Sequence, residues 1–291
     1  MKKLLPFFLY ATSAVSLMAS GKVTKKPELI DIGLDLEWFP ITNSMVTSWV
    51  VSLFIIVLIR LTVGKPKLLP GKGQIVVESV IGTVRSIIQP IVGKKVFFPS
   101  FWLLSGLFFF ILLHNVSGLF PGVGTIGYGH EVEGHFNVTQ PLIRPGNADL
   151  NMTLALALVS MACWLYLIFR YAGTKAILFD IFGTKAKKRD VGTVIYYCLV
   201  PLFLAVGIIE ILSIVFRPVS LTFRLFGNVF GGESLLHEMF LLGDKVGLAF
   251  IVPLPFYMME LLIGIVQALV FMLLVAVYIG LICNHPDGEE H

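Results

Sequence analysis

The stretch RPVSLTFRLFGNVFGGE, residues 217–233, carries three charged side chains inside a long apolar segment. Arg217 and Arg224 stand seven residues apart, and Glu233 follows nine residues after Arg224. A charged side chain at the centre of a bilayer costs at least ~2.5 kcal/mol. A chain that keeps three of them so close together is therefore expected to use them, which indicates a functional site within the membrane.

The composition is that of an integral membrane protein. Of the 291 residues, 56% are hydrophobic and 14% are charged, whereas soluble domains carry roughly 25% charged residues. We expect no nucleic-acid partner, no cofactor and no metal. The three cysteines lie in or at the end of apolar runs without CxxC spacing, so we interpret them as small core residues (Cys163, Cys198 and Cys283).

The first residues have the layout of a secretory signal. Lys2 and Lys3 precede a short apolar run, and Ala19-Ser20-Gly21 fits a cleavage site. We expect a signal peptide over residues 1–21 and an extracytoplasmic segment over residues 22–43. The alternative is an uncleaved first anchor, which would also deliver the following segment outside the cytoplasm.

Three segments have about the ~20 apolar residues that a transmembrane helix needs. They run from Ser44 to Val63, from Phe101 to Leu119 and from Leu150 to Phe169. Between the first two, the apolar residues from Ile75 to Ile91 recur at helical spacing with charged residues among them. This pattern predicts an amphipathic helix at the membrane interface.

Basic residues fix the orientation, because cytoplasmic loops carry an excess of Lys and Arg. The loops over residues 64–100, 121–149 and 170–192 hold six, one and six such residues. The first and third loops are therefore expected in the cytoplasm, with the mature N-terminus outside. Five spans then place the tail, residues 284–291, in the cytoplasm.

The last third contains two apolar runs that are too long for simple spans, from Val194 to Leu242 and from Val246 to Ile282. As one helix at ~1.5 Å per residue the first run would exceed ~70 Å, against a hydrocarbon core of ~30 Å. Each run is either a hairpin of two spans or one steeply tilted helix. The expected hairpin turn, FRPVSLT, lacks glycine and a polar cluster, so we favour two long tilted helices joined at Gly243-Asp244-Lys245.

The sequence thus predicts an all-α integral membrane protein whose membrane domain spans residues 44–283. We expect about five membrane helices plus an interfacial amphipathic helix, the last two membrane helices being long and steeply tilted. The polar, Gly-rich stretch over residues 121–149 is expected as an outside loop. Its GHEVEGH motif, residues 129–135, suggests a metal site, but the spacing is not HExxH and a solvated loop is the favoured interpretation.

Polar residues of the first long run fall on one helical face. Glu210, Arg217 and Arg224 are spaced by seven residues, which is almost two turns. Asn228 and Gly231 continue near the same stripe. The alternative interpretation is structural: Glu210 pairs with Arg217, and Arg224 extends to a surface. That explanation suits Arg217 better than Arg224, which lies far from either end of its run.

The returning helix adds a second set of polar groups. Glu260 and Gln267 are again seven residues apart, and Glu233 lies on the preceding helix toward the same outside turn. Two carboxylates on adjacent helices suggest a hydrophilic path from that side. Carboxylates can take up and release protons, whereas an arginine stays protonated in proteins. Arg224 is therefore expected to act as a barrier in a proton relay.

RPVSLTFRLFGNVFGGE resembles the signature of subunit a of the F-type ATP synthase. The segments EILSIVFRPVSL, PGNADLNMTLALAL (145–158) and GIVQALVFMLLVAVYIG (264–280) resemble other blocks of that family. The similarity covers about residues 40–283, and the Arg-Leu-Phe-Gly-Asn core is specific in this context. The family fold, a bundle with two long inclined helices, agrees with the tilted-helix prediction.

The resemblance implies a proton-translocating stator subunit, in a multi-pass bacterial inner-membrane protein that is not catalytic alone. Arg224 matches the arginine that faces the carboxylate of the rotating c-ring, and Asn228 matches an asparagine one turn on. Further positions match polar residues of the half-channel that is open to the outside (Glu233, Glu260 and Gln267), with a weaker match at three more (Asp149, Asn151 and Asn115). Three positions match the cytoplasmic half-channel (Glu210, Ser213 and Ser220). The implied partners are the c-ring, the peripheral-stalk b subunits, protons and the lipid membrane.

Two other classes of function compete with this one. A secondary transporter would use intramembrane charges to bind a solute, but it usually shows two related halves with broken helices. A membrane-embedded enzyme would need a catalytic motif, and FGGES is not a GxSxG elbow. Neither an HExxH motif nor paired intramembrane aspartates are present.

Overall fold

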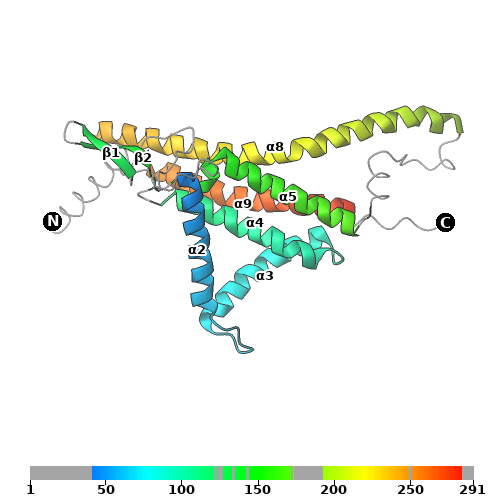
Figure 1. Cartoon of the computed structure of the whole chain (residues 1–291), viewed down its shortest axis with the longest axis horizontal. Helices are drawn as coiled ribbons and strands as arrows, with labels where there is room; N and C mark the ends of the chain where they lie inside the picture. The colour runs from blue at the N-terminus through cyan, green and yellow to red at the C-terminus, as the bar shows by residue number, and fades with distance from the viewer. Residues whose placement is uncertain are drawn as a thin grey trace. The chain divides into compact units, whose positions relative to one another are not determined.

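The computed structural model describes residues 41–120, 123, 127–132, 135–141, 144–171, 173, 193–248 and 251–283. Six long helices make up most of this part of the chain (Figure 1): α2 (Asn43–Val63), α3 (Lys72–Val92), α4 (Phe97–Gly118), α5 (Leu150–Tyr171), α8 (Thr193–Val246) and α9 (Leu254–Cys283). All six are long and apolar enough to cross a membrane by length and composition. The predicted all-α membrane architecture is confirmed.

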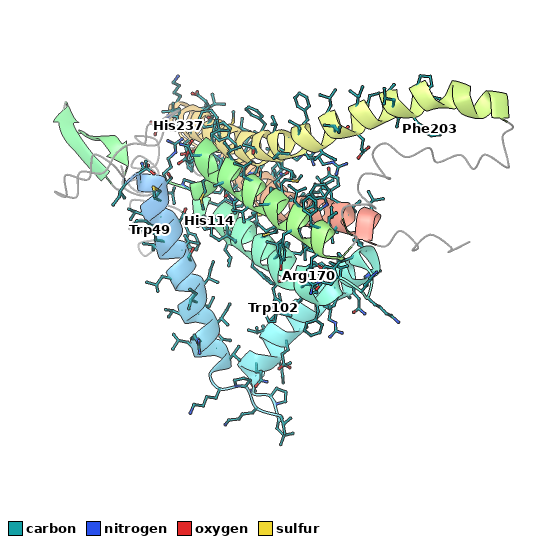
Figure 2. All side chains as sticks on the ribbon, turned by 45° about the vertical axis from the view of Figure 1, so that its right-hand side comes forward. Trp49, Trp102, His114, Arg170, Phe203 and His237 are labelled. Atoms are coloured by element: carbon teal, nitrogen blue, oxygen red, sulfur yellow. The ribbon has the colours of Figure 1, made fainter. Side chains whose placement is uncertain are left out.

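Helix α2 begins after Thr42, which has an extended conformation, and ends at Gly64. Gly64 has a φ of 59°, a value that favours glycine, and its amide closes the helix on Arg60 O at 2.9 Å. Only the first turns of α2 are buried, whereas most of the later apolar side chains of this helix are exposed (Figure 2, where Trp49 is labelled near the start of the helix). An apolar exposed surface of this kind suits contact with lipid.

Helix α3 is the helix expected at the interface. Val84, Ile88 and Val92 are buried and recur at the spacing of one helical face, while Glu78 and Arg85 are exposed. Pro90 lies in its last turn. The predicted helix is confirmed, and its placement along the membrane surface stays a prediction.

Helix α8 is continuous through Pro201 and Pro218, so the single-helix interpretation is confirmed and the hairpin is excluded (Figure 1). At ~1.5 Å per residue its 54 residues extend ~80 Å. Its apolar part alone, Pro201–Val246, exceeds the ~30 Å hydrocarbon core. A helix of this length therefore has to be strongly inclined to remain in the bilayer.

The turn after α8 lies later than expected. Residues 243–245 remain helical, and the chain leaves the helix at Gly247, where φ is 72°. The Leu248 amide donates to Gly243 O at 2.8 Å, which is the six-residue bond of a Schellman motif. The prediction of a turn at Gly243-Asp244-Lys245 is thus wrong, because the positive φ needed to end the helix is adopted by the next glycine.

The stretch between α4 and α5 has more regular structure than the expected loop. Strands β1 (Gly127–Val132) and β2 (His135–Pro141) pair antiparallel, and a short 3-10 helix, η1 (Gly146–Ala148), precedes α5. The described residues of the GHEVEGH motif lie in the two strands, with Val132 paired to His135. Glu133 and Gly134 lie outside the described residues, and no group of three or more His, Cys, Asp or Glu that could hold a metal occurs within the described ranges.

The chain divides into two compact units. The first comprises Met1–Glu78, Phe108–Thr153 and Phe223–Val270, and the second comprises Ser79–Leu107, Leu154–Thr222 and Phe271–His291. The expected signal peptide (1–21), nearly all of the extracytoplasmic segment (22–43) and the tail (284–291) lie outside the described residues.

Candidate functional site

A buried polar cluster occupies the first unit, and its first part joins α2 to the residues around η1. The Ser44 hydroxyl donates to Asp149 Oδ2 at 2.7 Å, and the Arg144 amide donates to Thr47 Oγ1 at 3.2 Å. Asp149 is 4% exposed, and Ser44 and Thr47 are buried as well. Burial of a polar group costs free energy unless it is hydrogen-bonded. These pairs therefore specify how the start of α2 packs on η1.

Asparagine side chains continue the cluster from η1 to α4 and α9. Asn147 Nδ2 donates to Asn115 Oδ1 at 2.7 Å, and Asn115 Nδ2 donates to Gly264 O at 2.9 Å. A Cβ on Gly264 would lie 3.1 Å from Asn115 Cβ, so the missing side chain allows α4 to approach α9 closely. The residue beside Asn115, His114, is fully buried on α4 (labelled in Figure 2).

Helices α8 and α9 meet through the last part of the cluster. Asn228 Nδ2 donates to Gln267 Oε1 at 2.9 Å, and Gly232 faces the carboxyl group of Glu260 so closely that a Cβ there would overlap it. Glu260 is 9% exposed and Gln267 is 5% exposed. The predicted common face of Glu260 and Gln267 is thus confirmed, and it packs on α8. A polar ladder now runs from Ser44 through η1, α4 and α9 to Asn228.

Glu233 also belongs to the interior of this unit. Nine residues separate it from Arg224, which is two and a half turns, so the two side chains leave α8 on opposite sides. Glu233 Oε2 is buried, and the side chain interacts electrostatically with the Arg144 guanidinium. Arg144 is 2% exposed and donates to Ala148 O at 3.2 Å. A buried acid and a buried base thus lie in one polar environment.

Several polar atoms of the ladder have no hydrogen-bond partner within the described residues: His114 Nε2, Asn147 Oδ1, Glu233 Oε2 and Gln267 Nε2. Buried polar atoms are nearly always paired, so each exception calls for an explanation. Four such atoms in one unit, on four different elements, are available to hydrogen-bond groups other than the described residues.

Arg224 lies outside the ladder, on the exposed side of α8. The side chain is exposed, and neither Gly227 nor Gly231 has a neighbouring atom within 4 Å of an added Cβ. Ser213 and Ser220 are exposed as well, and their spacing places them near the Arg224 face. The glycines beside Arg224 therefore leave room that no described part of this chain fills.

Arg217 is held within the second unit. Its Nη2 donates to Glu210 Oε1 at 2.9 Å, and its guanidinium lies 4.3 Å from the ring centroid of Tyr278 and 5.7 Å from that of Trp164. The structural pair of Glu210 with Arg217, weighed above as an alternative, is confirmed. Cation–π contacts with two rings add to it. The two arginines of the opening stretch thus have different surroundings.

Sequence reasoning missed several members of the ladder. Arg144, His114, Asn147 and the polar residues at the start of α2 were not singled out (Asn43, Ser44, Thr47 and Ser48). One feature of the sequence could have drawn attention to Arg144: it is the only Lys or Arg between positions 121 and 149. Conversely, the Asn151 side chain is exposed, and only its amide joins the site, donating to Asp149 Oδ1 at 3.0 Å.

Known proteins share this sequence over most of its length. A family model described as the ATP synthase A chain matches residues 45–280. The chain is 32% identical over 239 residues to an ATP synthase subunit a of Trichlorobacter lovleyi, covering 81% of this chain and 85% of that protein. It is 30% identical over 264 residues to an ATP synthase subunit a of Gloeobacter violaceus, covering 89% and 93%.

A further relative carries a more specific name. An ATP synthase subunit a of Propionigenium modestum, named as sodium ion specific, is 26% identical over 256 residues, covering 87% of this chain and 78% of that protein.

Fold and site together define a multi-pass membrane protein with a buried polar ladder and an exposed intramembrane arginine. The chain belongs to the ATP synthase A chain family, as the match over residues 45–280 and the relatives at 30% and 32% identity show. It is accordingly a membrane component of the ATP synthase complex, with a role in ATP synthesis and ion transport.

Proposed function

We propose that this chain is the proton-translocating stator subunit of an F-type ATP synthase. The observation that carries the proposal is the division of polar groups on α8. Asn228, itself exposed, donates to Gln267 of the buried ladder, and Glu233 Oε2 is buried on the opposite side of α8 from Arg224, which is exposed beside two open glycines. The ladder supplies an ion path, and the exposed arginine is available to a partner in the membrane.

The outer half-channel follows the polar ladder. Protons enter from outside near Asp149 and Asn115, with Asn151 at the rim, and reach the carboxylates of Glu233 and Glu260. The unpaired atoms of the ladder are suited to hydrogen-bond a passing proton carrier such as water. Gln267 and Asn228 bridge the ladder to the helix that carries Arg224.

Arg224 faces the ionisable carboxylate of the c-ring. A protonated ring carboxylate is neutral and can rotate into lipid, where an ionised one would be too costly. A carboxylate opposite Arg224 is favoured in its ionised form, because the guanidinium keeps its charge. The ring site therefore releases its proton toward the cytoplasmic half-channel, formed by Glu210, Ser213 and Ser220, before it reaches the arginine.

The same proposal fixes topology and partners. The mature N-terminus, after a signal peptide over residues 1–21, is outside the bacterial inner membrane, and the tail over residues 284–291 is cytoplasmic. The c-ring packs on the face of α8 that carries Arg224, and peripheral-stalk b subunits hold the chain against rotation. No observation favours a secondary transporter, since α8 and α9 are each unbroken rather than split at mid-length.

Replacement of both outer carboxylates tests the proposal. In inverted membrane vesicles, Glu233→Gln with Glu260→Gln should abolish ATP-driven acidification while the complex remains assembled on blots. Glu238→Gln serves as the matched control, because Glu238 is an exposed glutamate on the same helix. Native acidification by the double variant would place the outer path elsewhere. ATP-driven sodium uptake by vesicles with the native chain, in place of acidification, would show that the coupling ion is not the proton.

A further inference from the structure

The loop between α2 and α3, residues 64–71, presents two leucines to its surroundings. Its sequence is GKPKLLPG, and Leu68 and Leu69 are 104% and 89% exposed. Both side chains lie outside the two flanking helices, so their exposure is not the ordinary lipid contact of a transmembrane span. A pair of adjacent, fully exposed leucines is unfavourable in water.

The loop has a defined shape. Gln74, which is 7% exposed, accepts the Lys67 amide at 3.2 Å and donates to Lys67 O at 3.1 Å. The side-chain amide of Gln74 also donates to Glu78 Oε1 at 2.7 Å, which fixes the orientation of the Gln74 side chain. These bonds hold the backbone immediately before the two leucines. Leu68 and Leu69 are therefore presented by a braced loop.

The start of α3 is also pressed against the end of α2. A Cβ on Gly73 would overlap the carbonyl oxygen of Thr62, so the two helices approach backbone to backbone at this point. The absence of a side chain at Gly73 thus keeps the loop short and folded back. Both ends of the loop are tied to helices that are long and apolar enough to enter the bilayer.

The loop stays close to the end of α2. Leu68 lies five positions after the end of α2 at Val63, which allows at most ~17 Å of extended chain. The polar headgroup layer is itself ~5–8 Å deep on each side. The bond between Gln74 and Lys67 shortens the reach further. The two leucines accordingly remain within reach of the headgroups and of the acyl chains beneath them.

The charged residues within and next to the loop in the sequence are all basic, and the first acidic residue after it, Glu78, is bound to Gln74. Lys65, Lys67 and Lys72 are exposed, and residues 60–77 contain no acidic residue. Lysine side chains near an anionic leaflet each favour the surface by about fivefold in local partition. Apolar tips flanked by lysines complement an apolar layer bordered by phosphates. An acidic protein surface would satisfy the lysines but leave the leucines without an apolar partner.

We propose that residues 64–72 form a lipid-binding site, in which Leu68 and Leu69 insert into the leaflet while Lys65, Lys67 and Lys72 bind the phosphates of anionic headgroups. The site is separate from the ion path. It acts as an anchor that fixes the depth of the α2–α3 connection in the membrane.

Fluorescence at position 68 tests the site in the full chain. Leu68→Cys, in a background without the three native cysteines, is labelled with an environment-sensitive fluorophore. The protein is reconstituted into phosphatidylcholine vesicles with or without phosphatidylglycerol. We expect blue-shifted emission with phosphatidylglycerol and strong quenching by a lipid that is spin-labelled near its headgroup. Lys65→Gln, Lys67→Gln and Lys72→Gln together should remove the preference for phosphatidylglycerol, a change of about 100-fold if three fivefold effects combine.

Two controls make the result specific. Lys245→Gln makes the same chemical change near the C-terminal end of α8 and should leave the emission unchanged. Gln74→Ala releases the brace and should weaken quenching while the lysines remain. Water-like emission in both kinds of vesicle would overturn the proposal. Equal emission in the two kinds of vesicle, with no effect of the lysine changes, would also overturn it. Shielding of the probe that is seen only in the purified whole complex would overturn it too, because it would assign the surface to a protein partner.

Discussion

The contact between α9 and the end of α3 offers a direct test of packing in the second unit. A Cβ on Gly280 would overlap the carbonyl oxygen of Ile91 and lie 3.6 Å from Val92 Cα. The obstructing atoms belong to the backbone, so no side-chain rotation can relieve the overlap. Gly280→Ala should therefore force the two helices apart.

The expected magnitude follows from a matched pair of variants. Glycine to alanine in a helix interior gains roughly 0.5–1 kcal/mol of stability, and overpacking costs typically ~1–3 kcal/mol. Gly106→Ala should show the gain in helix stability without any overpacking, because Gly106 lies within α4 and has no atom within 4 Å of an added Cβ. Both variants gain the same helix propensity, so their free energies of unfolding should differ by the overpacking cost alone, about 1–3 kcal/mol.

Thermal unfolding in detergent measures that difference. At roughly 2–4 °C per kcal/mol for domains of about this size, Gly280→Ala should unfold about 2–12 °C below Gly106→Ala. The reaction of Cys163 with a thiol-reactive fluorophore during heating reports the transition in both, since this cysteine is free and half-buried in the same unit. Equal or higher Tm for Gly280→Ala would refute the backbone contact.

Gly232→Ala should reduce proton pumping without lowering Tm, because the added methyl group displaces only the flexible carboxyl end of Glu260; unchanged acidification by inverted vesicles would contradict this. Gly146→Ala should lower both Tm and pumping, since its Cβ would overlap the Ser48 hydroxyl and lie 2.9 Å from His114 Cδ2; a native Tm would show that the ring can move at no cost. Arg217→Lys should assemble normally, whereas Arg217→Leu should lose about 1–2 kcal/mol of stability, because both aromatic contacts need a cation. Equal amounts of the two Arg217 variants in membranes would argue against that role.

The long helices were predictable because their determinants are local. No glycine or polar cluster interrupts the chain around Pro218, and α8 is continuous there. The seven-residue spacings likewise predicted that Glu210 and Arg217 share a face, and the two side chains form an ion pair. Patterns within one helix require no knowledge of its neighbours.

The buried ladder was only partly predictable because it depends on contacts between distant segments. Arg144 reads as a loop residue in the sequence, yet its guanidinium is almost fully buried beside η1. His114 reads as part of an apolar span, and its burial against Gly146 requires α4 and η1 to meet. The opposite directions of Arg224 and Glu233 could have been read from their nine-residue offset.

The hydrogen bond between Asn115 and Gly264 also has a consequence for the order of events during biogenesis. The two residues are 149 positions apart, and α9 is the last helix of the described chain to be synthesised. At ~5–20 residues per second, Asn115 enters the membrane roughly 7–30 seconds before its partner leaves the ribosome. During that interval its amide has to be shared with Asn147, water or an insertion factor. Assembly of this subunit thus passes through a state in which a polar group waits in the bilayer for the end of translation.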